Sequence, residues 1–493
     1  MHRNTLRFMR MVDDAVCLQD ERLRLYKACE AVHFACSHAI SVYSSEKLEG
    51  IFLDIAQTRH VDLAGSFDEG SVLHVMSEAY TYGGHTRCVE RWIELDDSSQ
   101  KHSCVLLRQR KEYPDTLVDA VRKTRGTFYV WDPSLSVVER GLELRRLASH
   151  YEYVVLHIHP DDPVALIAFG TEEFKRPVIF FNHADHMFWL GVSIADCVAD
   201  LSNHGRKISL EFRKTVKSFF LGIPQELEQH KAIDKSSARK RLGLKDESLI
   251  IFTSGTESKF IPVGSLAFFE TMDFLLSQEE RACAVFVGLS VKKNVYLKRL
   301  SQKYPGRVSA YGTVDYKGEY LLRLAASDLV LDSFPVGGGT AVIDAIHAGK
   351  PVITMNRRQS DFLIRTRAFC KSPEEFKQKS QRVLQSPDYS RELLEEQSES
   401  LRDFNGPGAW KKRLRELKSV LPKNHRIYSF DSTGLPKEPS DDQIAVCRWI
   451  QPDIIEAFSM RRLLKFLFTF TWNSRRKRIS LLGINIINRR SDF

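Results

Sequence analysis

A glycine-rich segment offers the clearest chemistry in this sequence. Residues 332–354 read DSFPVGGGTAVIDAIHAGKPVIT, with three consecutive glycines between an apolar run and an expected helix. Such glycines let the backbone approach an anion closely and leave amide N–H groups free to point at it. The hydroxyl of Thr340, directly after them, can cap the helix or donate to a phosphate oxygen. We therefore predict a phosphate site at Gly338, Gly339 and Thr340.

The same segment carries a carboxylate that suits a sugar diol. Asp344 lies four residues after Thr340, so one helical turn should place both side chains on one face. A carboxylate there can accept hydrogen bonds from the vicinal hydroxyls of a ribose. The alternative is a plain strand-to-helix turn with a glycine-rich cap. The segment is not a Walker loop, since no GKS or GKT follows, and it lacks a GxGxxG fingerprint in the usual position.

Histidines form the second group of chemically capable residues. His85 lies in the glycine-softened turn TYGGHTR, and its imidazole, with a pKa of about 6.5, can take a proton from a hydroxyl. The alternative role for His85 is to cap the helix that follows. His183, Asp185 and His186 cluster in FNHADHMF, where we predict a polar wall on the acceptor side of a cleft.

A metal site is not predicted. His157 and His159 share a strand face in LHIHPDD, but no third ligand follows at a recognisable interval. The nine cysteines are scattered, with no two at the separation of a zinc or redox pair. No DxD motif follows an expected strand. We therefore expect chemistry without a metal and without a cofactor.

The elements that must position these groups follow from short apolar runs. Such runs alternate with helix-like segments, first at VLHVMSEAY, TFYVWD, YVVLHIHP and PVIFFNHADH, and later from LIIFTSG to PVITM. The alternation predicts an α/β protein with two doubly wound, Rossmann-like domains of parallel strands. The expected parts are a helical N-terminal extension (1–70), an N-terminal domain on the acceptor side (71–207), a connector (208–246), a C-terminal domain (247–405), and C-terminal helices with a basic amphipathic tail (406–493).

The glycine-rich segment resembles the donor-binding loop of GT-B glycosyltransferases, and among these the bacterial relatives of the O-linked N-acetylglucosamine transferases. FTSGTESKFIP is similar to their next donor element, in which a lysine, here Lys259, reaches the diphosphate of the nucleotide. RVSAYGTVD resembles the loop beside the base, which places Tyr311, Gly312 and Thr313 near a uracil. The resemblance covers about residues 71–400 and implies that the C-terminal domain binds a nucleotide sugar.

The resemblance also assigns roles in the N-terminal domain. The family carries a histidine in the loop after its first N-domain strand, and His85 matches that position. His183, Asp185 and His186 correspond to a stretch that lines the cleft between the domains. Many retaining members of the fold carry a glutamate eight positions before the ribose-binding acid. This chain has Val336 there, which favours inversion.

Charge and hydropathy bear on location. The 493 residues hold 72 Lys and Arg against 63 Asp and Glu, a formal charge of +9. Residues 457–493 hold nine Lys or Arg and one Asp, so the excess lies in the tail and nucleic-acid binding is not predicted. The tail can lie on an anionic membrane surface, with Phe466, Phe468, Phe470 and Trp472 in the interface, or pack on the fold as a terminal helix. Without a signal peptide or a long apolar run, we expect a cytoplasmic protein, with the tail as its contact to the inner face of the membrane.

Together these observations predict a Leloir-type glycosyltransferase for hexosyl or N-acetylhexosaminyl groups. Its partners would be a nucleotide sugar, expected to be UDP-linked, and a hydroxyl acceptor on a glycan, a lipid-linked saccharide or a protein. The transfer is expected to be metal-independent and inverting. Two alternatives stay open: a nucleotide-sugar 2-epimerase of the same fold, which needs no acceptor, and a non-catalytic scaffold at the membrane surface.

Overall fold

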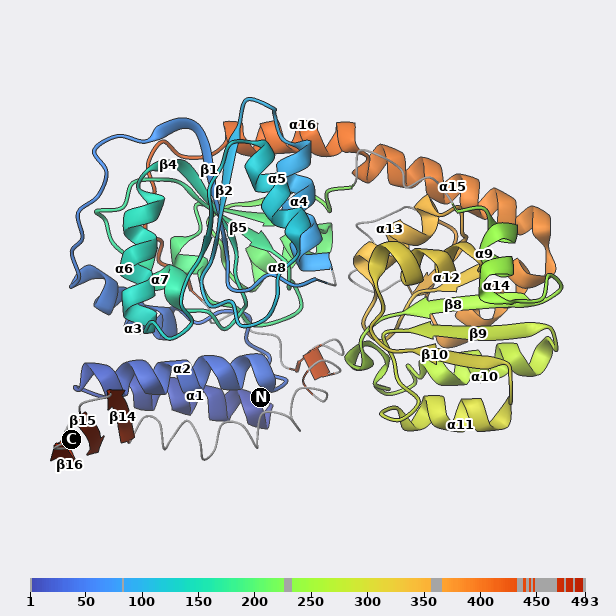
Figure 1. Ribbon diagram of the computed structural model, residues 1–493, viewed down its shortest axis with the longest axis horizontal. Coiled ribbons are helices and arrows are strands. Elements are labelled where there is room, and N and C mark those ends of the chain that lie inside the picture. The colour runs from blue at the N-terminus through green and yellow to red at the C-terminus, as the bar shows by residue number, and fades with distance from the viewer. Residues whose placement is uncertain are drawn as a thin grey trace.

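Two α/β domains lie side by side in the computed structural model (Figure 1). The structure describes residues 2–81, 84–225, 233–355 and 366–431, short pieces at 438–439, 443–444 and 447, and the backbone of strands between 468 and 490. The chain completes the first domain, builds the second, and then returns to the first through its last long helices.

Three helices precede the first sheet: α1 (Arg3–Val16), α2 (Glu21–Ser37) and α3 (Glu46–Gln57). Asp20 and Ser45 cap α2 and α3, because each side chain accepts a hydrogen bond from a backbone N–H of the first turn. Phe8 of α1 and Phe52 of α3 belong to the same apolar core as Leu73 of the first sheet. The N-terminal extension is therefore packed into the first domain.

The first sheet has seven parallel strands in the order β3-β2-β1-β4-β5-β6-β7. Its strands are β1 (Asp68–Met76), β2 (Lys101–Leu106), β3 (Phe128–Val130), β4 (Tyr151–His157), β5 (Val178–Asn182), β6 (Cys197–Asp200) and β7 (Ser218–Phe220). Its helices are α4 (Gly84–Leu95), α5 (Asp115–Lys123), α6 (Val137–Ala148), α7 (Val164–Phe169) and α8 (Asn203–Glu211). Apolar cores lie on both faces, as continuous apolar strands require. The sheet continues through β7, beyond the boundary expected at residue 207.

The second sheet has six parallel strands in the order β10-β9-β8-β11-β12-β13. Its strands are β8 (Leu249–Ser254), β9 (Ala282–Val287), β10 (Val308–Tyr311), β11 (Leu329–Leu331), β12 (Val352–Met355) and β13 (Phe369–Cys370). Its helices are α9 (Lys235–Leu242), α10 (Phe268–Gln278), α11 (Val295–Lys303), α12 (Leu321–Ala325), α13 (Gly339–His347), α14 (Pro373–Gln385) and α15 (Pro387–Asn405). The prediction of two doubly wound domains is confirmed.

A final helix, α16 (Pro407–Ser419), ties the chain back to the first domain (Figure 1). Trp410 of α16 is fully buried, and its ring centroid lies 5.6 Å from that of Trp92 of α4. Its indole N–H donates to the Gly222 carbonyl at 3.3 Å, and Lys418 binds the Asp96 carboxylate at 2.7 Å. Helix α16 lies at the start of residues 406–493, where the sequence predicted C-terminal helices.

The basic tail differs from the helix expected there. Its described backbone forms an antiparallel sheet of β14 (Phe468–Asn473), β15 (Arg476–Leu481) and β16 (Ile484–Arg490). Phe466 and the tail side chains lie outside the described residues, so membrane contact stays a prediction. Within the described part of the chain, no helix is long and apolar enough to cross a membrane.

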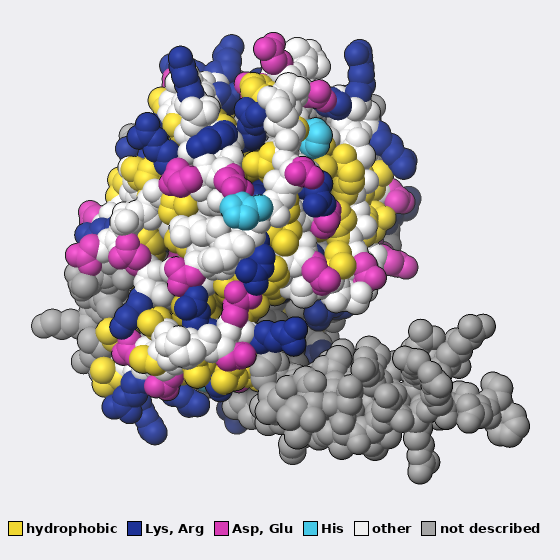
Figure 2. Space-filling view, turned by 90° about the vertical axis from the view of Figure 1, so that its left-hand side faces the viewer, with side chains coloured by type: hydrophobic (Ala, Val, Ile, Leu, Met, Phe, Trp, Pro, Cys, Tyr) yellow, Lys and Arg dark blue, Asp and Glu magenta, His cyan; other side chains and the backbone are white. Residues whose placement is uncertain are grey.

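Surface charge on the side of the molecule nearest α6 is mixed. Figure 2 shows Lys and Arg side chains interspersed with Asp and Glu on this face. Among the described side chains of this face, no patch of a single sign stands out.

Candidate functional site

Two adjoining cavities lie between the domains. The larger has a volume of about 1410 Å³ and the smaller a volume of about 440 Å³. Both are bordered by Gly84 of the first domain and by Lys259, Gly338 and Thr340 of the second. The domains come so close here that a Cβ added to Gly84 would lie 2.9 Å from Thr340 Cγ2. These four residues mark the junction of the two cavities.

The glycine-rich loop is held by an acid at the end of β11. The Asp332 carboxylate accepts hydrogen bonds from the Gly338 N–H at 2.7 Å and the Thr354 hydroxyl at 2.8 Å. Helix α13 starts directly after Gly338, and no described side chain caps it. Its first-turn amides therefore face the cavity junction with the positive end of the helix dipole. Asp332 was not assigned this role from the sequence; its place between a strand and a glycine loop is the available signal.

Lys259, which the sequence analysis placed near a diphosphate, lies against this loop. It belongs to a short 3-10 helix (Glu257–Phe260) that follows β8. Its ammonium donates to the Gly337 carbonyl at 3.1 Å, and its own carbonyl accepts from the Val336 N–H at 3.4 Å. Burial lowers the pKa of the Lys259 ammonium. The structure thus brings the predicted lysine, the glycine loop and the start of α13 to one place.

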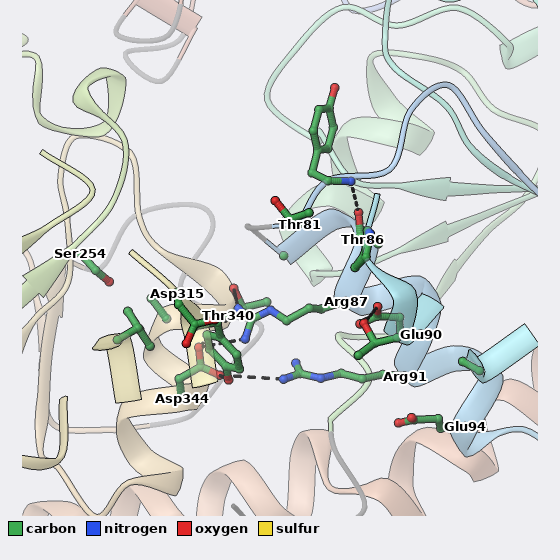
Figure 3. Close-up of a pocket in the computed structure, with 18 of the residues that line it drawn as sticks. Thr81, Thr86, Arg87, Glu90, Arg91, Glu94, Ser254, Asp315, Thr340 and Asp344 are labelled. Carbon is green, nitrogen blue, oxygen red and sulfur yellow. Dashed lines mark hydrogen bonds and ion pairs between the residues drawn. The ribbon is translucent and has the colours of Figure 1, made fainter. Parts of the chain in front are cut away.

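Asp344 borders the larger cavity and is bound from both domains (Figure 3). Its carboxylate accepts from Arg87 of α4 at 3.3 Å and from the Tyr316 hydroxyl at 3.0 Å. Arg91, one turn further along α4, lies 3.9 Å from the other carboxylate oxygen. The Arg87 guanidinium also stacks over the Tyr316 ring at 4.0 Å and donates to the Thr340 hydroxyl at 3.2 Å. Arg87 was not predicted, because in the sequence it reads as an ordinary helix residue.

The loop RVSAYGTVD was expected to lie beside the nucleotide base, with Tyr311, Gly312 and Thr313 near it. Only part of this loop borders the larger cavity. Thr313 borders the cavity, as do the two residues that follow it. The Tyr311 ring, by contrast, packs under the Arg323 guanidinium at 3.8 Å and is partly exposed. The carbonyls of Tyr311 and Gly312 accept from the Gly288 N–H, which fixes the turn. Among the three residues, Thr313 is the one placed to contact a ligand in this cavity.

The smaller cavity is bordered by several polar residues of the first domain. Among them are His85, from the first turn of α4, and His183, Asp185 and His186, from the loop after β5. The Asp185 carboxylate lies 3.4 Å from His186 Nδ1 and accepts from the Ser202 hydroxyl at 3.2 Å. The three residues that the sequence analysis grouped as an acceptor-side wall thus lie together at the border of this cavity. Among the described residues, no group of three or more His, Cys, Asp or Glu has the arrangement of a metal site.

His85 has a defined tautomer. Its Nε2 lies 3.1 Å from the His157 carbonyl, and because a carbonyl only accepts, Nε2 must carry the hydrogen. Nδ1 then holds the lone pair, and it is buried with no hydrogen-bond partner among the described residues. The ring centroid lies 4.2 Å from that of His183. Burial, with a smaller effect of His159, lowers the pKa of His85 to about 3, so the ring is neutral at pH 7.

Comparisons with known proteins rest on the fold. The sequence matches no family model and no curated protein. The structure is similar to Anabaena HepE in complex with UDP and glucose, at a TM-score of 0.55 and 14% identity, over 71% of this chain and 100% of that one. It is also similar to a mutant O-GlcNAc transferase of Thermobaculum terrenum, at a TM-score of 0.51 and 15% identity, over 85% of this chain and 77% of that one. A third similar structure is sucrose-phosphate synthase of Thermosynechococcus elongatus, at a TM-score of 0.51 and 15% identity, over 71% of this chain and 99% of that one.

At 14% to 15% identity, the structural similarity shows the fold alone. The similarity runs through both sheets, since it covers at least 71% of this chain in each comparison. Two doubly wound domains, the cavities between them and a last helix that returns to the first domain are all present. The chain therefore has the GT-B fold, which is the fold of the glycosyltransferases whose donor-binding loop its glycine-rich segment resembles.

Proposed function

We propose that this protein is a glycosyltransferase that moves a sugar from a UDP-sugar to a hydroxyl acceptor, without a metal and with inversion. One observation carries the proposal: the two cavities meet at Lys259 and at the start of α13. A nucleotide sugar matches this arrangement, since its anionic diphosphate lies between a nucleoside and a sugar just as the junction lies between the two cavities.

The larger cavity suits the nucleoside. Asp344, at its border, can accept hydrogen bonds from the ribose hydroxyls, and Thr313 can contact the base. The diphosphate would then lie at the start of α13, where backbone amides, the Thr340 hydroxyl and the Lys259 ammonium converge. This order leaves the sugar pointing into the smaller cavity. The structure of Anabaena HepE holds UDP and glucose, which supports UDP as the nucleotide to test first.

The smaller cavity suits the acceptor and the general base that takes its proton. In the proposed step the acceptor oxygen bonds to the anomeric carbon while the bond from that carbon to the diphosphate breaks. The electron pair of that bond leaves with UDP, whose added charge Lys259 and the amides of α13 stabilise. His85 Nδ1 takes the acceptor proton, since no described residue donates to its lone pair. Val336, where retaining members of the fold carry a glutamate, supports inversion.

The acceptor is proposed only by class: a hydroxyl on a glycan, a lipid-linked saccharide or a protein. His183, Asp185 and His186 would form the wall against which it binds. A hydroxyl-bearing acceptor fits a wall of imidazole and carboxylate groups, because both accept hydrogen bonds. The basic tail would bring the enzyme to an anionic membrane if the acceptor is lipid-linked.

A nucleotide panel tests the donor site. UDP, GDP, ADP and CMP are titrated by calorimetry into the wild type, Lys259→Ala and the control Lys298→Ala, whose lysine is exposed on α11. We expect UDP to bind the wild type and Lys298→Ala alike and Lys259→Ala about 10- to 100-fold more weakly, the loss of one charged hydrogen bond. If a nucleotide other than UDP binds, the proposed donor carries that nucleotide instead of UDP. Binding of none would contradict the proposal.

A further inference from the structure

Arg87 reaches from the first domain to the second at the border of the larger cavity (Figure 3). It lies in the first turn of α4, two residues after His85. Its guanidinium donates to the Thr340 hydroxyl at 3.2 Å and to the Asp344 carboxylate at 3.3 Å, and both of these residues belong to α13. A side chain of one domain thus ends between two residues to which the proposed function assigns the nucleotide.

The contact with Thr340 leaves that hydroxyl able to bind an anion. A guanidinium only donates, so Thr340 Oγ1 accepts and the hydroxyl keeps its own hydrogen for another acceptor. The proposed function places a phosphate oxygen there. A phosphate oxygen that accepts from Thr340 lies beside the Arg87 guanidinium, whose planar set of N–H donors matches phosphate geometry.

The positive ends of two helices meet at the same place. α4 begins at Gly84 and α13 at Gly339, and a Cβ added to Gly84 would lie 2.9 Å from Thr340 Cγ2. Neither helix has an acid in its first turn. Since the helix dipole opposes a cation in the first turn, the stability of α4 does not explain the position of Arg87. An anion bound between the two helices would remove this conflict.

The guanidinium is charged and largely enclosed. The Arg87 side chain is 18% exposed and stacks over the Tyr316 ring at 4.0 Å. Burial opposes the charge, but Asp344, Tyr316 and Tyr320 outweigh burial and raise the pKa of Arg87. A charge that is shielded from water acts on a neighbouring anion more strongly than the same charge in solvent.

We propose that Arg87 binds the diphosphate of the nucleotide sugar and stabilises the charge that UDP gains as the sugar leaves. The inference rests on the proposed function and adds a catalytic residue of the first domain to the donor site. In the step, the acceptor oxygen bonds to the anomeric carbon, and the electron pair of the broken bond passes to the diphosphate oxygen. The acceptor proton goes to His85 Nδ1. Arg87 and Lys259 face the new charge from the two domains.

A single turn of α4 then serves both halves of the reaction. His85 borders the smaller cavity, and Arg87, two residues further along, borders the larger one. Residues two apart on a helix do not share a face, which explains how neighbouring positions serve different cavities. The base and the cation are therefore held at a fixed separation by the backbone of one helix.

Two simpler roles for Arg87 predict different results. A strut between the domains would orient Asp344 without touching the nucleotide, so its loss would affect every ligand that contacts Asp344 equally. A competitor would occupy the nucleotide site until UDP displaces it, so its loss would strengthen UDP binding. A direct contact with the diphosphate ties the effect of Arg87 to the phosphate groups.

Charge and hydrogen bonding at position 87 can be separated by substitution. Arg87→Gln keeps an amide that can donate to Thr340 or Asp344 but removes the charge, and Arg87→Lys keeps the charge. The control is Arg122→Gln, at an exposed arginine of α5. Affinity for UDP is measured by calorimetry. Affinity for uridine, which has the same base and ribose but no phosphate, is measured by ligand-observed NMR.

We expect Arg87→Gln to bind UDP about 10- to 100-fold more weakly than the wild type and Arg122→Gln, the loss of one charged contact with phosphate. Its affinity for uridine should change little, so its preference for UDP over uridine falls. Arg87→Lys should bind UDP more tightly than Arg87→Gln. With saturating UDP-glucose or UDP-N-acetylglucosamine as probes, UDP release by Arg87→Gln should be at least about tenfold slower than by the wild type.

Equal losses of affinity for UDP and uridine in Arg87→Gln would show that Arg87 acts through Asp344, and tighter UDP binding would show that it competes with the nucleotide. Either result overturns the inference, as do an unchanged affinity and rate. In these cases, UDP binding by the wild type that depends on Lys259 leaves the proposed function in place. A wild type that neither binds UDP nor releases it overturns the proposed function and the inference together.

Nitrogen NMR of the wild type gives a reading that does not depend on how well a variant folds. In protein labelled with ¹⁵N-arginine, the side-chain signal of Arg87 is assigned by its absence from Arg87→Lys. This signal should shift further with UDP than with uridine, because only UDP brings phosphate to the guanidinium. Equal shifts with the two ligands, or no shift with UDP, would contradict the contact.

Discussion

At the scale of single residues, Asp344 shows how a buried carboxylate at the border of a cavity is kept in place. A buried carboxylate without partners would be costly, and this one is satisfied by Arg87, Tyr316 and, at longer range, Arg91. Its partners come from both domains, so the acid is oriented by the contact that closes the site. A ribose bound here would take a share of these hydrogen bonds. The role of Asp344 should therefore show in nucleotides that differ by one hydroxyl.

We expect the wild type to bind UDP about tenfold or more tightly than 2′-deoxy-UDP, since a hydrogen bond to a charged group is worth about 1.5–3 kcal/mol. In Asp344→Ala the two nucleotides should bind with equal affinity, because the group that distinguishes them is gone. Calorimetry with both ligands measures the four affinities. Equal preference for UDP in the wild type and the variant would show that Asp344 does not contact the ribose.

At the scale of elements, the sequence predicted the strands whose apolar runs are long and the loops that follow them. LIIFTSG, PVIFFN and the glycine-rich segment could be placed because a buried parallel strand and a glycine loop have recognisable compositions. β2 (Lys101–Leu106) and β6 (Cys197–Asp200) were not among the expected strands, since their sequences KHSCVL and CVAD are short and partly polar. His85 and His183 could be expected to share a cleft because both follow strand ends.

The contacts of His74 with His102 and His157 could not be predicted in the same way. His74 and His102 lie inside apolar runs, where a single histidine reads as a core residue with a local partner. Their pairing depends on the register of β1 against β2 and β4, and a shift of one residue would turn the rings to the opposite face. Arg87 was missed for a related reason, since its partner Asp344 lies 257 residues away in the sequence. Contacts between distant segments leave no local spacing to detect.

Helix α16 offers a stability test at this scale. Trp410→Ala removes a fully buried indole that packs on Trp92 and donates to the Gly222 carbonyl. We expect the free energy of unfolding to fall by about 3–5 kcal/mol, as for other large aromatic truncations in cores. Trp410→Phe, which keeps most of the apolar volume, should lose less. Urea unfolding measures both, and a loss below about 1 kcal/mol in Trp410→Ala would contradict the packing described.

At the scale of the whole molecule, the site exists only where the two domains meet. Gly84 and His85 come from the first domain, and Lys259, Thr340 and Asp344 come from the second. Neither domain alone encloses either cavity, so the contacts that hold the domains together also shape the site. The first domain also carries three fully buried histidines, His74, His102 and His157, on adjacent strands of its sheet. That feature should give the protein a characteristic response to acid.

We expect the protein to lose stability as the pH falls below about 6.5. The unfolded chain then protonates His74, His102 and His157, while the folded chain does not, because burial lowers their pKa values. Each such histidine can cost up to about 1.4 kcal/mol per pH unit. Burial raises the pKa of Asp200 to about 6 and also raises the pKa values of Glu49 and Asp332, so these acids work in the opposite direction as the pH falls.

Urea unfolding at pH 7.5, 6.5 and 5.5 measures this response. The unfolding midpoint should drop most between pH 6.5 and 5.5, and His74→Gln should show a smaller drop than the wild type, since it has one such group fewer. A midpoint that rises or stays constant over this interval would mean that the histidines are protonated in the folded protein as well.

The most direct test of the central claim is UDP release from nucleotide sugars, followed by NMR of the sugar product. UDP-glucose, UDP-galactose, UDP-N-acetylglucosamine and UDP-N-acetylgalactosamine are incubated with the wild type, His85→Ala and Lys259→Ala. The account predicts that the wild type releases UDP from at least one of them and forms a product of inverted anomeric configuration, while both variants are at least about 100-fold slower. No release by the wild type, or equal release by all three proteins, would contradict it.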